Sequence, residues 1–166
     1  QISNGITVED WFSLLDVTQP AAVHLLIALN GAAGGVFNVL VDNTTGFIYV
    51  RAYDKVTRAY TQTLVNNQVN WTGGAWFHIA LTLTETTWQV YVNAGSFTGA
   101  SGTCNLAPNW YQLSFNGQAS RFGTGAMWKG VISQAVLFPA VLPQTRIVTH
   151  YWASLNALSA TDAASN

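Results

Sequence analysis

The sequence predicts an all-β sandwich or barrel with one short helix near its C-terminal end. Short runs rich in Val, Ile, Phe, Tyr, Trp and Thr recur along the chain, as is typical of β-strands. Turn residues such as Asp, Asn, Thr and Gly separate these runs at the spacing of sandwiches and barrels. A helical pattern occurs once, close to Pro143. Together these observations favour strands throughout, closed by a helix.

The alternation of apolar and polar residues predicts which strand faces meet the core. In residues 76–83, Phe77, Ile79 and Leu81 share one face, which we expect to be buried. In residues 88–93, the side chains of Gln89, Tyr91 and Asn93 form the more polar, outer side of a hairpin with residues 76–83. That outer side is a candidate part of a ligand surface. Strands are expected over residues 7–15, 22–29, 36–41, 47–53, 60–65, 76–83, 88–92, 111–115 and 127–138.

The helix is expected to begin with Pro143 in its first turn and to end before Ala157. Within it, Ile147, His150 and Tyr151 fall on one face. Residues 157–166 turn to Ala, Ser, Thr and Asn, and we expect them to form a flexible tail or linker after a single domain over residues 1–156. The chain begins with Gln1 rather than Met, which implies processing or a piece of a longer polypeptide.

Composition excludes several classes of partner. Only 8% of the 166 residues are charged and the net charge is −1, so nothing resembles the basic surface that binds nucleic acid. No run reaches the roughly 20 apolar residues of a membrane span, and we expect no membrane insertion. Cys104 is the sole cysteine, which excludes an internal disulfide and is best explained as a small packing residue. The polar groups on the surface must therefore be mainly amides and hydroxyls, as in a protein that binds neutral sugars or packs among neighbours.

Five segments carry motifs that point to a known family. They are residues 6–12 (ITVEDWF), 76–82 (WFHIALT), 88–95 (WQVYVNAG), 128–138 (WKGVISQAVLF) and 142–151 (LPQTRIVTHY). A Trp-His strand is followed by a turn and a strand of the type Tyr-Val-Asn, and a late core strand leads into a closing helix that ends in His-Tyr. These segments resemble the laminin-G-like branch of the concanavalin A-like lectin/glucanase superfamily. They stand in the family's order and span nearly the whole chain.

The resemblance implies a two-sheet antiparallel jelly-roll β-sandwich with a short C-terminal helix. Domains of this kind bind sugars, proteins or surfaces, also within phage tail and fibre proteins, and the fold alone does not choose among these roles. Two positions depart from the family pattern. Residues 93–95 insert Ala94 into the usual Asn-Gly, and Ser133 and Gln134 replace an acidic pair, which argues against an acidic or calcium-assisted site there.

Catalysis is not expected. A glycosidase needs two carboxylates that face one site, but Glu9 and Asp10 are adjacent and so point to opposite faces of a strand. The other carboxylates stand singly, and no Gly-x-Ser-x-Gly nucleophile motif occurs. His24, His78 and His150 are better explained as structural residues.

Exposed aromatic rings next to amides are the expected ligand site, because sugar rings stack on aromatic side chains while amides bind hydroxyls. Tryptophans in periodic elements, Trp11, Trp76, Trp88 and Trp152, are expected to pack in the core. We expect no cofactor, although Asp42, Asn43 and Thr44 or Asp54 leave calcium open as an alternative. The ligand-binding candidates flank loops and are Trp71, Trp110, Trp128, Asn43, Asn70, Asn116 and Arg121.

The sequence therefore leads to two hypotheses. The first is a non-catalytic recognition or attachment module that binds a glycan or host-surface receptor as part of a larger extracellular or virion-surface protein. The alternative is a structural domain that decorates a virus particle or fibre and packs against neighbouring subunits. A contiguous exposed apolar patch would favour the alternative.

Overall fold

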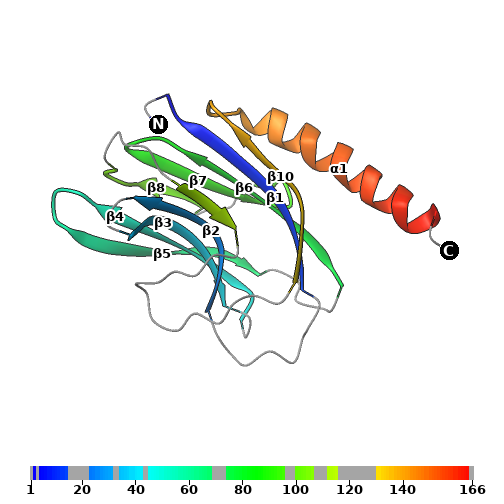
Figure 1. The fold of residues 1–166 in the computed structure, drawn as a ribbon, viewed down its shortest axis with the longest axis horizontal. Helices are drawn as coiled ribbons and strands as arrows, with labels where there is room; N and C mark the ends of the chain where they lie inside the picture. Colours follow the sequence, from blue (N-terminus) through cyan, green and yellow to red (C-terminus); the bar gives the residue numbers. More distant parts are fainter. Residues whose placement is uncertain are drawn as a thin grey trace.

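The computed structural model describes residues 2, 4–14, 23–31, 34–42, 45–68, 74–95, 100–106, 112–115 and 130–164. Two antiparallel five-stranded sheets pack face to face, and one helix follows them (Figure 1). The elements are β1 (Ile6–Leu14), β2 (Val23–Gly31), β3 (Gly34–Asp42), β4 (Phe47–Asp54), β5 (Ala59–Gln68), β6 (Trp76–Leu83), β7 (Thr87–Val92), β8 (Ser101–Thr103), β9 (Gln112–Phe115), β10 (Gly130–Phe138) and α1 (Gln144–Ala164).

The strand order confirms the predicted two-sheet sandwich. The first sheet, which we call sheet A, has the order β10-β1-β6-β7-β8, and the second, sheet B, has the order β5-β4-β3-β2-β9. All nine predicted strands are present as β1 to β7, β9 and β10, with shifts at their ends. The short strand β8 was not predicted, because Ser101, Gly102 and Thr103 carry no apolar alternation.

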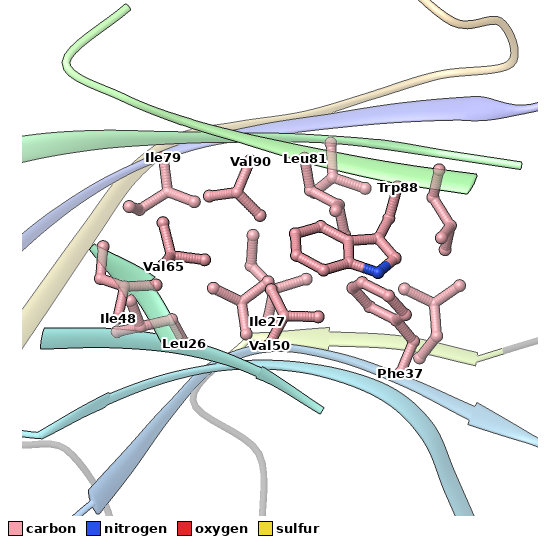
Figure 2. Packing of buried hydrophobic residues seen from close by; sticks show 14 of the residues in the cluster. Leu26, Ile27, Phe37, Ile48, Val50, Val65, Ile79, Leu81, Trp88 and Val90 are labelled. Carbon is pink, nitrogen blue, oxygen red and sulfur yellow. The ribbon is translucent and has the colours of Figure 1, made fainter. Parts of the chain in front are cut away.

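The core lies between the two sheets, where the inward side chains of both interdigitate. Figure 2 shows Ile79, Leu81 and Trp88 of sheet A opposite Phe37 and Val50 of sheet B. All five are at most 3% exposed. The alternation predicted in residues 76–83 is confirmed, because Ile79 and Leu81 point into this core. Burial of such apolar side chains is the main driving force of folding.

The helix α1 covers part of the outer face of sheet A (Figure 1). Ile147 is fully buried there against Ala80 and Tyr91, with Leu142 at the edge of the contact. The backbone oxygen of Pro143 accepts the first helical hydrogen bonds. Because the helix continues to Ala164, the predicted end before residue 157 was wrong. The division into a domain over residues 1–156 and a tail stays a prediction.

Three of the four tryptophans expected in the core are at least partly buried. Trp11 and Trp88 are 2% and 3% exposed, whereas Trp152 is 55% exposed and that expectation was wrong. Trp152 follows Tyr151, which faces sheet A, and the helical turn of about 100° per residue carries it to the open side of α1. Trp76 is half-buried. No helix in the described part of the chain is long and apolar enough to cross a membrane.

Candidate functional site

The loop residues predicted to bind a ligand lie outside the described residues. This holds for all seven: Trp71, Trp110, Trp128, Asn43, Asn70, Asn116 and Arg121. Their role stays a prediction. The described residues instead form two clusters of polar side chains on the outer face of sheet A, one beneath α1 and one beside it.

Beneath α1, a carboxylate lies between two histidines. Glu9 of β1 is 4% exposed, and its Oε1 lies 3.0 Å from Nδ1 of His150 in α1. Its Oε2 lies 3.5 Å from Nε2 of His78 in β6, which is 1% exposed. We call these three residues the Glu9 cluster. Because Glu9 contacts a strand neighbour and the helix at once, the cluster connects α1 to sheet A.

The electrostatics of the cluster keep Glu9 ionised. Burial works to raise the pKa of the Glu9 carboxyl, but hydrogen bonds and charge interactions with His78 and His150 outweigh it, so the pKa is lowered. Aromatic rings enclose the cluster. Trp11 stacks on Tyr151 with ring centres 5.4 Å apart, and Phe138 stacks on His150 at 5.3 Å. An ionised carboxylate held by two imidazoles is a stable arrangement in such a setting.

A cavity of about 250 Å³ lies beside the cluster, between β1, β6, β10 and α1. A carboxylate that orients an imidazole supplies two of the three members of a hydrolytic triad, which also needs a hydroxyl or thiol hydrogen-bonded to that imidazole. Ser154 lines the cavity, but neither His78 nor His150 forms a hydrogen bond to a hydroxyl or thiol of a described residue. The geometry supports a structural contact, as expected for these two histidines.

Asp10 points into the sandwich on the face opposite Glu9, as the sequence predicted. It is fully buried, and neither carboxyl oxygen accepts a well-formed hydrogen bond from a described residue. Burial raises the pKa of Asp10 to about 8. The side chain is therefore neutral at pH 7, and the two adjacent carboxyls share no site.

Beside α1, the outer face of β6, β7 and β8 forms an open groove of about 450 Å³. We call it the β8 groove. Leu83, Trp88 and Gly102 face the core side of these strands, so the residues beside them in sequence face the groove. Within the described part of the chain its polar lining is uncharged, namely Thr82, Thr84, Thr87, Gln89, Ser101 and Thr103.

The predicted alternative of a calcium site gains no support from the described residues. Among them, no group of three or more His, Cys, Asp or Glu side chains could hold a metal ion. Oδ1 of Asp54 accepts backbone hydrogen bonds from Val56 and Thr57 at 2.7 and 2.8 Å, which is the ordinary use of Asp in a turn. Asn43 and Thr44 lie outside the described residues.

Cys104 is a packing residue, as predicted. It is half-buried against the core, and burial raises the pKa of its thiol to about 11. Its Sγ lies 3.6 Å from the backbone oxygen of Thr84 and 3.7 Å from that of Glu85. A protonated thiol in this position is a poor nucleophile.

The sequence indicated only part of the β8 groove. The outer side of residues 88–93 was predicted as a ligand surface, and Gln89 is indeed in the groove. Tyr91 of the same side is instead buried under α1. Ser101 and Thr103 were missed, because their three-residue strand has no hydrophobic period to reveal it.

Comparisons with known proteins agree with this architecture. Residues 1–148 match the model of the Laminin_G_3 family, described as the concanavalin A-like lectin/glucanases superfamily. A search of curated protein sequences found no match. At 14% to 16% sequence identity, the solved structures below are similar in fold alone.

Two of the similar structures are domains of botulinum neurotoxin. The receptor binding domain of the C/D mosaic serotype has a TM-score of 0.63 at 15% identity, and the alignment covers 92% of this chain and 37% of that one. The binding domain of serotype D has a TM-score of 0.63 at 16% identity, with 92% and 38% covered. The chain thus spans less than two fifths of these domains.

A third similar structure is an enzyme. The sialidase of Trypanosoma rangeli, in complex with 2,3-difluorosialic acid, has a TM-score of 0.64 at 14% identity. The alignment covers 89% of this chain and 22% of the sialidase. The shared region is therefore a minor part of that protein.

Proposed function

The chain belongs to the Laminin_G_3 family of concanavalin A-like lectins and glucanases, and on that premise we propose that it is a non-catalytic recognition module. It binds a glycan or host-surface receptor as part of a larger extracellular or virion-surface protein. The family description includes both lectins and glucanases, so the site must decide between binding and hydrolysis.

The placement of the carboxyl groups carries the proposal. Glycoside hydrolysis needs two carboxyls about 5 to 10 Å apart across the bond that is cleaved. Glu9 lies under α1 with both oxygens near histidines, and Asp10 lies inside the sandwich. Asp54 is the last residue of β4, and Glu85 lies in the turn between β6 and β7. Among these described carboxyls no pair faces one cavity, which supports the lectin half of the family description.

The similar binding domains of botulinum neurotoxin add support of a weaker kind. They are similar in fold, and one is a receptor binding domain and the other a binding domain of botulinum neurotoxin. The low content of charged residues, 8% of the chain, agrees with a neutral polar ligand. The sialidase shares the fold over only 22% of its chain, so its activity does not transfer.

The experiment is a glycan array combined with host-cell binding of the 166-residue chain. We expect saturable binding, with no hydrolysis of the bound glycan. The variants Trp71→Ala, Trp110→Ala and Trp128→Ala test whether the predicted loop residues take part. A folded chain that binds no glycan and no cell surface would overturn the proposal.

A second candidate function, assembly with neighbouring subunits, is favoured by the edge strand β10. Three apolar side chains are exposed there: Val131 at 39%, Val136 at 41% and Leu137 at 53%. Trp152 of α1, the element that follows β10 in the chain, is also exposed. The strand pairs with β1 alone among the described strands and carries no charge. Exposed apolar edges are typical of interfaces.

Sedimentation of the purified chain tests the assembly role. Association that weakens in Leu137→Asp, with Val56→Asp as an exposed control in the turn between β4 and β5, would support it. A monomer at all concentrations that also binds no partner protein would exclude it.

A further inference from the structure

The polar side chains of the β8 groove form two rows across three strands. Thr82, Gln89 and Ser101 are direct cross-strand neighbours and make the first row. Thr87 and Thr103 are paired in the second row, where the hydroxyl of Thr84 lies 2.8 Å from that of Thr87. Adjacent strands lie about 4.8 Å apart and alternate residues of one strand about 6.6 Å apart. The groove thus presents hydroxyls and one amide on a regular lattice.

Part of this lattice has hydrogen-bonding capacity to spare. The turn uses the Thr84 hydroxyl, which accepts from the backbone amides of Thr86 and Thr87 at 3.2 and 2.9 Å. In contrast, the side chains of Gln89, Ser101 and Thr103 form no hydrogen bond to another described residue. Ser101 and Thr103 are exposed. Together they offer two hydroxyls and an amide, which both donate and accept.

An apolar wall borders the groove at Val141, which is 45% exposed. Its position is fixed by Thr7, whose buried hydroxyl donates to the Ala140 oxygen and accepts from the Leu142 amide, both at 2.8 Å. Gly5 has φ of 76°, and a Cβ there would collide with Val141. Thr7 therefore anchors the backbone around Val141, and the absent side chain of Gly5 leaves room for it.

The floor of the groove depends on Gly102. A Cβ on this residue would lie 2.6 to 2.9 Å from the indole of Trp88, which is closer than carbon atoms approach each other. Because Gly102 has no side chain, the indole packs beneath β8 and holds this three-residue edge strand against the core. The hydroxyls of Ser101 and Thr103 then face outward.

We propose that the β8 groove binds an uncharged saccharide. This inference rests on the proposed function and adds its location and ligand class. Ring hydroxyls would bond to Ser101, Thr103 and Gln89, while the apolar face of a sugar ring would rest on Val141. Among the described residues no charged side chain lines the groove, so neutral sugars are favoured over sialylated or sulfated ones. The volume of about 450 Å³ is within the range of small-ligand sites.

The test compares two matched threonines on edge strands of the two sheets. Thr103→Arg fills the groove, whereas Thr61→Arg places the same bulk and charge on exposed β5 of sheet B. On the glycan array we expect Thr103→Arg, and Ser101→Arg alike, to weaken binding to neutral saccharides at least tenfold. Thr61→Arg should bind like the unaltered chain. Circular dichroism and thermal unfolding confirm the fold of each variant.

The remaining outcomes separate this inference from the proposed function. If binding is lost in Trp71→Ala, Trp110→Ala or Trp128→Ala but kept in Thr103→Arg, the location is wrong while the recognition function stands. Binding only to sialylated or sulfated glycans, or only to a peptide, overturns the ligand class. If the unaltered chain binds no glycan, the proposed function and this inference fail together.

Discussion

The outer face of sheet A has two halves that share strands β6 and β7, and α1 covers only one of them. In β6, His78 and Ala80 lie under α1 and are at most 1% exposed, while Thr82 begins the open β8 groove. In β7, Tyr91 is buried under α1, and Gln89 borders the groove. The helix, together with Leu142 just before it, covers the first half and leaves the second open.

The comparison explains the chemistry of each half. Under the helix, polar side chains are shielded from water, so the Glu9 carboxylate finds its partners in His78 and His150 of the protein. In the groove, water can satisfy Ser101 and Thr103, and their side chains need no partner in the protein. A covered polar residue should therefore affect stability, and an open one should affect binding.

The largest effect on stability is expected from Ile147→Ala, which weakens the contact by which α1 covers one half of the outer face of sheet A. Removing a fully buried isoleucine side chain typically lowers the free energy of unfolding by about 2 to 5 kcal/mol. Urea unfolding measures this change. Arg146→Ala, an exposed neighbour in α1, is the control and should cost less than about 0.5 kcal/mol. Equal effects of the two variants would contradict burial of α1 on sheet A.

The next largest effect is expected from Glu9→Gln, which should lower the free energy of unfolding by about 1.5 to 3 kcal/mol because hydrogen bonds to a charged group are lost. The lowered pKa of Glu9 means that its contribution is present above its ordinary pKa of 4.5 and fades as the pH falls through the lower folded value. The difference between Glu9→Gln and the unaltered chain should therefore shrink in acid. Unfolding at pH 7 and pH 3 checks this, with Glu85→Gln in a turn as control.

Asp10→Asn should instead stabilise the protein. Its pKa is raised from 3.8 to about 8 in the folded state, so the unfolded chain releases this proton more easily and stability falls as the pH rises between these values. We expect a gain of more than about 1 kcal/mol at pH 8 and little change at pH 4. A loss of stability at pH 8 would show that the carboxyl is needed in its ionised form.

The smallest effect on stability is expected in the open half. Ser101→Ala and Thr103→Ala should change the free energy of unfolding by less than about 0.5 kcal/mol, because water replaces what these hydroxyls bind. Under the proposal, the same variants weaken neutral saccharide binding. Calorimetric unfolding and glycan titration of each variant measure both. A large loss of stability would mean that these hydroxyls are structural.

Strand patterns identified most of the fold and little of the candidate site. Long strands such as β6 have a period that burial imposes, so Phe77, Ile79 and Leu81 were assigned correctly. Strand β8 has only three residues and no such period. Likewise, no local pattern indicates that Glu9 contacts His150, because 141 positions separate them in the chain.

The sequence by itself determined the strands, their inward faces and the opposite directions of Glu9 and Asp10, because alternation in a strand is a local property. The choice of a two-sheet sandwich over a barrel came from the family resemblance. The tertiary structure alone decided which part of an outer face lies under α1 and which part stays open. That choice depends on contacts between residues far apart in the chain, such as Ile147 with Ala80 and Thr7 with Leu142. Residue type and spacing do not encode them in any local pattern.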